Sequence, residues 1–346
     1  MTTVTIKASK PYDVVIGDGI IENIVALVQP VCATRRVAVI TDDIVDKLYA
    51  DVVIERLSSS GYTVSKHVFP NGEQSKNIRT LSAILEFLAE HNLSRSDTLI
   101  ALGGGVVGDI TGFAAAVYMR GIDFIQVPTT LLAAVDASVG GKTAIDLAYG
   151  KNLAGAFWQP RMVLCDTKII RDLPDNLFAN GMGEVIKHGF LAGQDILDAI
   201  DHDEAKSELE WLIKRNVEIK RDVVEADEKE HGTRRLLNFG HTVAHAVEKM
   251  SDYTVLHGIA VGTGMVYETR LAEQLGLCEQ GLADTVQAYC GKYGLYRVQD
   301  INDAFIEAMT HDKKNEDDRI VFALPEGIGA FRIEKLSVAD VKRLLL

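Results

Sequence analysis

The first half of the chain alternates short β-branched runs with stretches whose apolar residues recur at helical spacing. The runs occupy residues 35–42, 63–69, 98–103 and 124–128. Between the second and third runs, one helical face is marked by Ile78, Leu81, Ile84, Leu85 and Leu88. This alternation predicts a parallel sheet covered by amphipathic helices.

The second half of the chain has a different pattern. After Pro174 the strand signal thins and long helical periodicity takes over. The periodic stretches are 206–228, 238–250 and 258–276. The sequence before this change, residues 172–174, is typical of a helix start. We therefore predict an α/β domain over residues 1–170 and a mostly α-helical domain over residues 171–346.

The composition is that of a folded protein. Of the 346 residues, 47% are hydrophobic and 25% are charged, close to the average of globular domains. The net charge is −13. That sign disfavours binding to nucleic acid or to an anionic membrane.

Several features bear on the cellular location. Residues 99–119 carry one charge, Asp109, over a length that could span a membrane, but five glycines favour a buried strand, turn and helix. The N-terminal segment lacks the apolar region of a signal peptide. No two of the four cysteines are close enough in the sequence to form a CxxC pair. They are Cys32, Cys165, Cys278 and Cys290. We expect a reducing cytoplasm and no membrane span.

A glycine-rich turn joins the third predicted strand to a predicted helix. Gly103, Gly105 and Gly108 fit the spacing G-x-G-x-x-G, which lets a phosphate approach the amides of a helix N-terminus. Close packing would explain the same glycines, so both interpretations stay open. The next strand ends at 127–130 without the acid expected to bind a ribose, whereas Asp42 ends an earlier strand. If a dinucleotide binds, we expect its ribose to be held in a variant way.

Residues 135–157 hold a second candidate cluster. Lys142, Lys151 and Asn152 lie among glycines without periodicity, which suits a loop that surrounds an anion with ammonium and amide donors. The letters GGKT resemble the end of a P-loop, but position 136 is Asp where that motif needs glycine, which excludes an ATPase. The alternative is an ordinary solvated loop.

Two histidines form a third candidate cluster. His241 and His245 are spaced i, i+4 and share one face of a predicted helix, which suits a metal or a substrate. Position 242 is Thr, so the motif is not the HExxH of zincin proteases. A third ligand would come from Glu184 or His257. Either histidine could instead be a packing residue of the core.

Taken together, these clusters resemble the 3-dehydroquinate synthase family. No single motif is specific, but nine of them follow in the order found in that family and span nearly the whole chain. They are NGEQSK (71–76), LGGGVVGD (102–109), FIQVPTTLLA (124–133), DASVGGKT (136–143), GKN (150–152), EVIKHG (184–189), LNFGHT (237–242), LHG (256–258) and HDKK (311–314).

The resemblance implies two cofactors and a fold. A zinc or cobalt ion is held by Glu184, His241 and His257, with positions left open for substrate, and His245 becomes a substrate-side residue. NAD is bound tightly. The implied fold is a Rossmann-like parallel sheet in an NAD-binding domain, residues 1–170, followed by a helical metal- and substrate-binding domain, residues 171–346.

The resemblance also implies a role for individual residues. Those implied for NAD are Asp42, Glu73, Lys76, Gly104, Gly105, Val106, Asp109, Thr129, Thr130, Lys142 and Lys151. Those implied around the substrate phosphate are Arg120, Lys142, Asn152, His245 and Lys313, with Lys151 on the same loop as Asn152. Those implied at the substrate carboxylate are Lys220 and Arg234. The implied catalytic set is Asp136, Lys142, Lys187, Asn238 and His245.

The implied reaction converts 3-deoxy-D-arabino-heptulosonate 7-phosphate to 3-dehydroquinate and phosphate, in the shikimate pathway of aromatic amino acid biosynthesis. Transient oxidation with NAD gives a ketone that acidifies the C6 proton. Phosphate then leaves by elimination, its own oxygen taking that proton, so His245 and the lysines position charge. Reduction, ring opening and an intramolecular aldol follow. The resemblance also implies a homodimer, in which Arg120 reaches the partner subunit's phosphate site.

Three alternatives compete with this interpretation. Related sugar phosphate cyclases that make valiolone or scyllo-inosose precursors act on substrates without a carboxylate, so Arg234, Lys220 and Asn238 argue against them. Metal-dependent polyol and alcohol dehydrogenases lack the EVIKHG and GKN elements. A non-catalytic NAD-binding module would not need every expected catalytic position to be filled.

Overall fold

The computed structural model describes residues 1–310 and 319–345, and the chain divides into two compact units. The first comprises Met1–Leu173 and Glu208–Glu228, and the second comprises Pro174–Ser207 and Lys229–Leu346. Glu208–Glu228 falls within the range 171–346 expected for the helical domain, but its contacts group it with the α/β elements. The assignment of NAD to one domain and of metal and substrate to the other stays a prediction.

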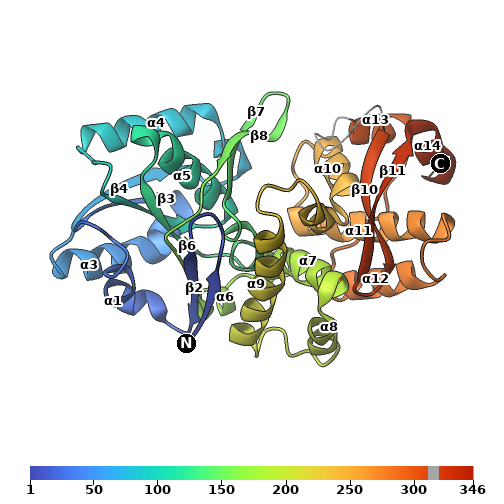
Figure 1. The fold of residues 1–346 in the computed structure, drawn as a ribbon, viewed down its shortest axis with the longest axis horizontal. Helices are drawn as coiled ribbons and strands as arrows, with labels where there is room; N and C mark the ends of the chain where they lie inside the picture. Colours follow the sequence, from blue (N-terminus) through green and yellow to red (C-terminus); the bar gives the residue numbers. More distant parts are fainter. Residues whose placement is uncertain (311–318, 346) are drawn as a thin grey trace. The chain divides into compact units, whose positions relative to one another are not determined.

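The first unit is built on a seven-stranded sheet in the order β1-β2-β9-β6-β5-β3-β4 (Figure 1). Its strands are β1 (Thr2–Ile6), β2 (Tyr12–Gly17), β3 (Arg36–Asp42), β4 (Thr63–Phe69), β5 (Thr98–Gly103), β6 (Asp123–Pro128) and β9 (Met162–Asp166). β1 pairs antiparallel with β2, and the remaining neighbours pair in parallel. The four strands predicted from β-branched runs are β3 to β6, which confirms the predicted sheet.

Helices cover both faces of this sheet (Figure 1). On one face, α1 (Ile24–Val28) and α3 (Asp51–Ser59) share a hydrophobic core with the strands, and on the other α4 (Ile78–Glu90) and α5 (Gly105–Val117) share a second. Leu81, Ile84 and Leu88 of the predicted apolar stripe are buried in that second core. Ile78 is 58% exposed because it is the first residue of α4, so the stripe begins one turn later than predicted.

The order of the strands produces a topological switch between β3 and β5. From β3 the chain continues to β4 at the edge of the sheet, and it then returns to the other side of β3 to form β5 and β6. Ligands of open parallel sheets bind at the carboxyl ends of the strands at such a point. Here those ends are Asp42 and Gly103.

The first unit contains five further elements. They are the antiparallel hairpin β7 (Lys142–Leu147) and β8 (Gly150–Phe157), and the helices α2 (Asp43–Val45), α6 (Thr167–Arg171) and α9 (Leu209–Ala226). Before β7 lies a one-turn π-helix, Ala133–Ala137, which contains Asp136. Single π-turns are frequent at functional sites.

The second unit is mostly helical, as predicted. Its helices are α7 (Asp175–Ala192), α8 (Gln194–Asp201), α10 (His241–Met250), α11 (His257–Gln274), α12 (Leu282–Lys292), α13 (Asp303–Thr310) and α14 (Val338–Leu345). An antiparallel hairpin, β10 (Arg319–Gly327) and β11 (Ala330–Ser337), was not expected from the sequence. The periodic stretches 238–250 and 258–276 correspond to α10 and α11.

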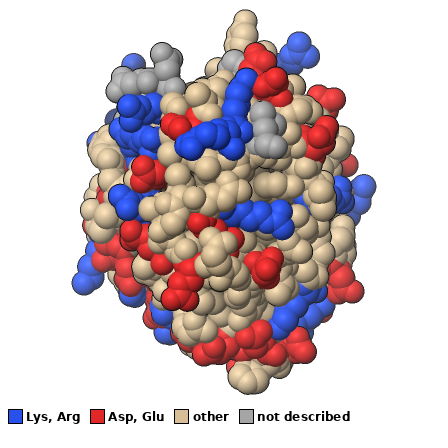
Figure 2. All heavy atoms as spheres, turned by 90° about the vertical axis from the view of Figure 1, so that its right-hand side faces the viewer, with Lys and Arg blue, Asp and Glu red and all other residues tan. Residues whose placement is uncertain are grey.

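The helices and the surface charges can be compared with the expectation that the chain does not span a membrane. No helix among residues 1–310 and 319–345 has the length and apolar character to cross a membrane. The apolar run that begins at residue 99 forms β5, the glycine-rich turn and α5 instead. Figure 2 shows acidic and basic side chains interspersed over one face, so that face carries no large field of a single sign.

Candidate functional site

The glycine-rich turn ends β5 at Gly103 and begins α5 at Gly105. Gly104 is the residue before the helix and provides no side-chain cap, so the first amides of α5 are open to an anion. A Cβ on Gly103 would lie 2.4 Å from the Val107 side chain, and one on Gly108 would lie 2.6 Å from Gln126 Oε1. Close packing therefore explains Gly103, whereas the neighbour of Gly108 is the end of a flexible glutamine side chain. A Cβ on Gly105 would meet its nearest neighbour at 3.5 Å, an ordinary contact, so packing does not require that glycine.

The strand ends beside this turn are held by local hydrogen bonds. Asp42 is 4% exposed, and its Oδ1 accepts the amides of Ile44 at 3.0 Å and Val45 at 2.9 Å. This predicted NAD residue thus also caps the helix that follows β3, a role that sequence analysis did not anticipate. The amide of Thr129 donates to the Gly103 carbonyl at 2.9 Å, which fixes the end of β6 against the turn.

Five predicted residues of the first unit form one charged cluster. Lys76 is 4% exposed, and its Nζ lies 2.5 Å from Asp109 Oδ2, 2.6 Å from Asn152 Oδ1 and 3.9 Å from Glu73 Oε1. Lys151 Nζ lies 3.8 Å from the same Glu73 oxygen. These five residues converge from three separate segments, the turn that holds Glu73 and Lys76, helix α5 with Asp109, and strand β8 with Lys151 and Asn152.

Burial and neighbouring charges shift the pKa values in this cluster. Burial alone would lower the pKa of Lys76, but Asp109 and Glu73 raise it to about 12. Burial raises the pKa of Asp109 against the opposing charge of Lys76. Burial also raises the pKa of Asp146 to about 6, and Asp146 Oδ1 accepts the Asn152 amide at 2.8 Å. Asp146 was missed in the sequence because a single acid in a hairpin carries no distinctive spacing.

Asp136 and Lys220 form a second pair in the first unit. Lys220 of α9 is 6% exposed, and its Nζ donates to Asp136 Oδ1 at 2.6 Å and to the Asp136 carbonyl at 2.5 Å. The resemblance had given Asp136 a catalytic role and had placed Lys220 at the carboxylate of the substrate. In the structure the two side chains contact each other.

Glu184, His241 and His257 come together in the second unit. Glu184 lies on α7 and is fully buried, while His241 and His257 are the first residues of α10 and α11. Glu184 Oε1 lies 3.5 Å from His241 Nε2 and 3.1 Å from His257 Nε2. The three donor atoms lie within 4.8 Å of one another. Two imidazoles and one carboxylate are a donor set that suits zinc or cobalt, so these residues fit the implied ion.

The surroundings of Glu184 favour its charged form. Burial would raise its pKa, but the Lys187 ammonium, which forms an ion pair with Glu184 Oε2, and the two imidazoles hold that pKa well below its usual range. Burial would lower the pKa of His257, but hydrogen bonds to Glu184 and Glu248 raise it to about 10. Glu248 was missed in the sequence, although its position seven residues after His241 places it on the same helix face.

The remaining predicted substrate residues lie in different surroundings. In the second unit, the His245 ring stands edge-on to the His241 ring at 5.7 Å, and Asn238 Nδ2 donates to Glu230 Oε1 at 2.9 Å. Arg234 is 1% exposed in the short helix Thr233–Asn238. Arg234 is therefore not part of an exposed salt bridge at the surface. Lys313 lies outside the described residues.

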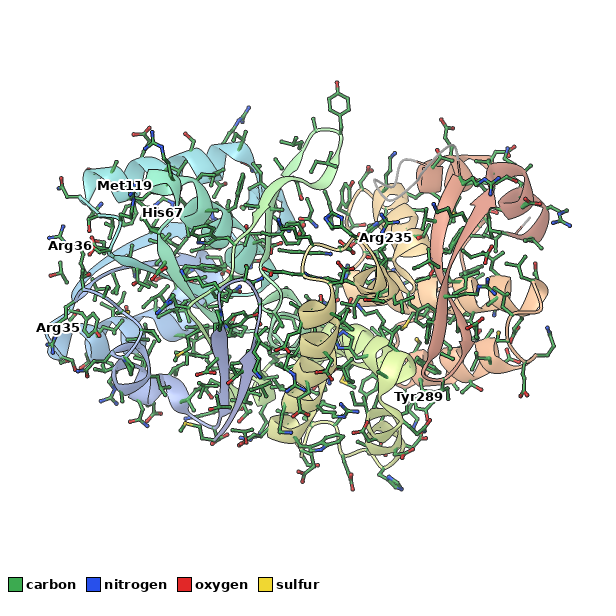
Figure 3. All side chains as sticks on the ribbon, viewed as in Figure 1. Arg35, Arg36, His67, Met119, Arg235 and Tyr289 are labelled. Carbon is green, nitrogen blue, oxygen red and sulfur yellow. The ribbon has the colours of Figure 1, made fainter. Side chains whose placement is uncertain are left out.

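Arg120 and Lys142, in the first unit, are both exposed. Arg120 follows Met119 (labelled in Figure 3), and both have left-handed backbone conformations, with φ of 67° and 48°. Such conformations are uncommon for residues other than glycine and mark a strained turn. Lys142 is the first residue of β7.

Two solved structures that this chain resembles over nearly its whole length are sugar phosphate cyclases. A 2-deoxy-scyllo-inosose synthase complexed with carbaglucose-6-phosphate, NAD⁺ and Co²⁺ has a TM-score of 0.90 at 26% identity and covers 99% of both chains. A 2-epi-5-epi-valiolone synthase from Streptomyces hygroscopicus subsp. jinggangensis, with NAD⁺ and Zn²⁺ bound, has a TM-score of 0.87 at 25% identity and covers 96% of this chain and 95% of that one. The fold of this chain is thus that of the sugar phosphate cyclases.

The sequence comparisons identify the family within that class. Residues 66–180 match the family model for the N-terminal part of 3-dehydroquinate synthase, and residues 181–315 match that for its C-terminal part. The 3-dehydroquinate synthase of Clostridium kluyveri is 41% identical over 96% of this chain and 94% of its own length. That of Lactococcus lactis subsp. cremoris is 41% identical over 97% of both. The chain belongs to the 3-dehydroquinate synthase family, which confirms the resemblance found in the sequence.

Proposed function

We propose that this chain is a 3-dehydroquinate synthase that converts 3-deoxy-D-arabino-heptulosonate 7-phosphate to 3-dehydroquinate and phosphate. The observation that carries this proposal is the buried cluster of Glu184, His241 and His257 in a chain about 41% identical to 3-dehydroquinate synthases over nearly its whole length. The related cyclases with solved structures are only 25% and 26% identical. A non-catalytic module would have no need of a buried metal-binding set.

The metal site is formed by the second unit. Glu184, His241 and His257 would hold a divalent zinc or cobalt ion, which supplies a Lewis acid that polarises the substrate hydroxyls. Lys187 would stay paired with Glu184 and neutralise its charge in the buried site. His245 would remain free of the ion and face the substrate phosphate, and Asn238 would donate to a ring hydroxyl.

The NAD site would use the strand ends at the switch point of the first unit. NAD supplies the transient oxidation that acidifies the C6 proton and the later reduction. The amides of Gly104, Gly105 and Val106 would bind its pyrophosphate, since the first turn of α5 has no side-chain cap. Thr129 and Thr130 would line the same place at the end of β6. Asp42 would reach the adenosine end with its second carboxylate oxygen.

The charged cluster of the first unit would serve the same cofactor. Glu73, Lys76 and Asp109 would close around NAD, with Lys151 at the edge of the cluster. Asn152 and Lys142 would bind the substrate phosphate. Lys220 and Asp136 would stay hydrogen-bonded to each other, as they are in the structure. Arg234, of the second unit, would bind the substrate carboxylate as a bidentate fork.

A direct assay tests the function. With the heptulosonate phosphate, NAD and zinc or cobalt, we expect steady release of inorganic phosphate that stops when a chelator is added and returns with excess metal. The control is the same chain with sedoheptulose 7-phosphate, which lacks the carboxylate and should release phosphate more slowly. Faster release from sedoheptulose 7-phosphate would favour a related cyclase.

We also propose a homodimer in which Arg120 completes the phosphate site of the partner subunit. Within the described residues, no hydrogen bond or ion pair to the Arg120 side chain is found. Its turn also exposes Val117 and Met119, at 42% and 45%. A cationic side chain on a strained, partly apolar surface turn suits a contact with another chain.

Mixing two inactive variants tests this arrangement. An Arg120→Ala chain and a Lys142→Ala chain should each lose most activity alone, because each lacks one cation at the phosphate. In a mixed dimer one of the two sites has both residues intact, so we expect mixed dimers to recover about half of the wild-type activity per dimer. No recovery in verified mixed dimers would place Arg120 in its own subunit's site or outside the sites.

A cytoplasmic location is part of the same proposal. Its support is that Cys32, Cys165, Cys278 and Cys290 are all free thiols in the structure. Free thiols are usual in a reducing compartment.

A further inference from the structure

Two buried glutamates connect the helices that carry the metal-binding histidines. Glu248 lies on α10 and Glu268 on α11, with exposures of 2% and 0%. α10 begins at His241 and α11 begins at His257. Each glutamate contacts the beginning of the other helix, so the two contacts are reciprocal.

The first contact orients His257. Glu248 Oε1 lies 3.2 Å from His257 Nδ1, and His257 Nε2 faces Glu184 Oε1 at 3.1 Å. A carboxylate on one ring nitrogen fixes the tautomer and the plane of an imidazole, so the other nitrogen is presented to a metal. Glu248 therefore determines which nitrogen of His257 faces the Glu184 carboxylate.

The second contact fixes the first turn of α10. Glu268 Oε2 accepts the Gly240 amide at 2.8 Å, and Glu268 Oε1 accepts those of Thr242 at 3.0 Å and Val243 at 3.1 Å. The residue before α10 is Gly240, with φ of 81° and no side chain to cap the helix. The amides of a first helical turn need acceptors from elsewhere. Glu268 supplies them from α11, on both sides of His241.

The backbones of the two helices also approach closely at this place. A Cβ on Gly264 would lie 1.9 Å from the Gly240 carbonyl oxygen, so only glycine lets α11 lie against the turn that precedes His241. Gly264 is one turn of α11 before Glu268, and both face the same turn. The position of His241 is thus tied to α11, the helix that starts with His257.

We propose that Glu248 and Glu268 are positioning residues of the metal site, which set the separation and direction of His241 and His257 before the ion binds. This inference rests on the proposed function, because it takes Glu184, His241 and His257 as the metal ligands. Neither glutamate needs to touch the ion. A site whose ligands are already in place binds its ion more tightly than one whose ligands must be ordered first.

Cobalt binding to the metal-free chain tests the proposal. The variants are Glu248→Ala, Glu248→Gln, Glu268→Ala and Glu268→Gln. We expect the alanine variants to bind Co²⁺ about 10- to 100-fold more weakly and to shift its visible absorption bands, because the histidines are less well oriented. The glutamine variants should recover part of the affinity, since an amide oxygen still accepts one hydrogen bond.

A matched control separates positioning from stability. Thr269 is fully buried beside Glu268 on α11, and its hydroxyl donates to the Met265 carbonyl within the same helix. Thr269→Val should lower the unfolding temperature but leave cobalt affinity and absorption unchanged. In the metal-free chain, Glu268→Gln should also speed hydrogen exchange at the amides of Thr242 and Val243.

Alanine variants with wild-type cobalt affinity and absorption would overturn the proposal, as would equal weakening in Thr269→Val. If an alanine variant does not fold, the glutamine variant decides, and unchanged cobalt binding and exchange in it would equally overturn the proposal. A wild-type chain that binds no cobalt would contradict the metal site itself, which distinguishes failure of the proposed function from failure of this inference.

Discussion

Replacing Glu184, His241 or His257 by alanine is expected to abolish tight metal binding and with it phosphate release. Each substitution leaves two protein ligands, too few to hold a divalent ion tightly. We expect metal affinity to fall by more than the roughly 100-fold that residues outside the ligand set produce. Metal content after gel filtration, measured on each purified variant, gives the result.

His245→Ala is the matched control for this prediction. His245 is one turn from His241 on α10, with the rings 5.7 Å apart, but it lies outside the cluster of three donors. It should therefore keep its metal while it loses activity, because only a substrate contact is removed. A His245→Ala chain that loses its ion as completely as His241→Ala would overturn the ligand assignment.

Arg234→Ala is expected to lose most of the preference for the heptulosonate phosphate over sedoheptulose 7-phosphate. A planar guanidinium binds a carboxylate bidentately, and loss of such a charge-assisted contact costs about 1.5 to 3 kcal/mol, or roughly ten- to a hundred-fold in binding. An exposed salt bridge would contribute only about 0 to 1 kcal/mol and would not discriminate between the two substrates. The ratio of kcat/KM for the two substrates measures the effect.

Arg235→Ala and Arg234→Lys serve as controls in the same assay. Arg235, labelled in Figure 3, is adjacent in the same short helix but is only partly buried, whereas Arg234 is 1% exposed. Arg235→Ala should leave the substrate ratio close to that of the wild type. Arg234→Lys keeps the charge but not the fork, so we expect an intermediate ratio. An unchanged ratio in a folded Arg234→Ala chain would remove Arg234 from the carboxylate site.

The sheet could be predicted because buried parallel strands appear as apolar runs between turn residues. β4 and β5 begin and end where the pattern placed them, and β3 and β6 differ by one residue at one end. The hairpin of β10 and β11 was not predicted. It lies in a part of the chain whose other elements are helices. The strand–helix alternation that revealed the strands of the first half is absent there.

The candidate site was predictable only in part from the residues themselves. The i, i+4 spacing identified His241 and His245, but it could not choose between them, and Glu184 is far away along the sequence. Contacts of this kind are set by the packing of helices that are distant in sequence. Lys220 with Asp136, and Glu268 with the start of α10, depend on such packing and have no local signal. Only the family resemblance identified Glu184, His241 and His257 as the three metal ligands, because the spacing left that choice open.

The glycine-rich turn is a motif that was recognised in the sequence but has two possible explanations. Its spacing left a phosphate site and close packing equally open, and the structure supports packing at Gly103. Gly104 and Gly105 remain the candidates for phosphate binding. A spacing motif alone cannot separate these roles, because both need a residue without a Cβ.

The central claim is that this chain closes a carbocycle with a redox cofactor that is used and restored within each turnover. Phosphate and NADH measured together, in one reaction with the heptulosonate phosphate, metal and NAD at a concentration close to that of the enzyme, test it most directly. We expect phosphate to exceed the total NAD many times over while the absorbance of NADH stays flat after the first turnovers. NADH that rises in step with turnover, or phosphate release that stops once the NAD has been reduced, would contradict the synthase and indicate a dehydrogenase.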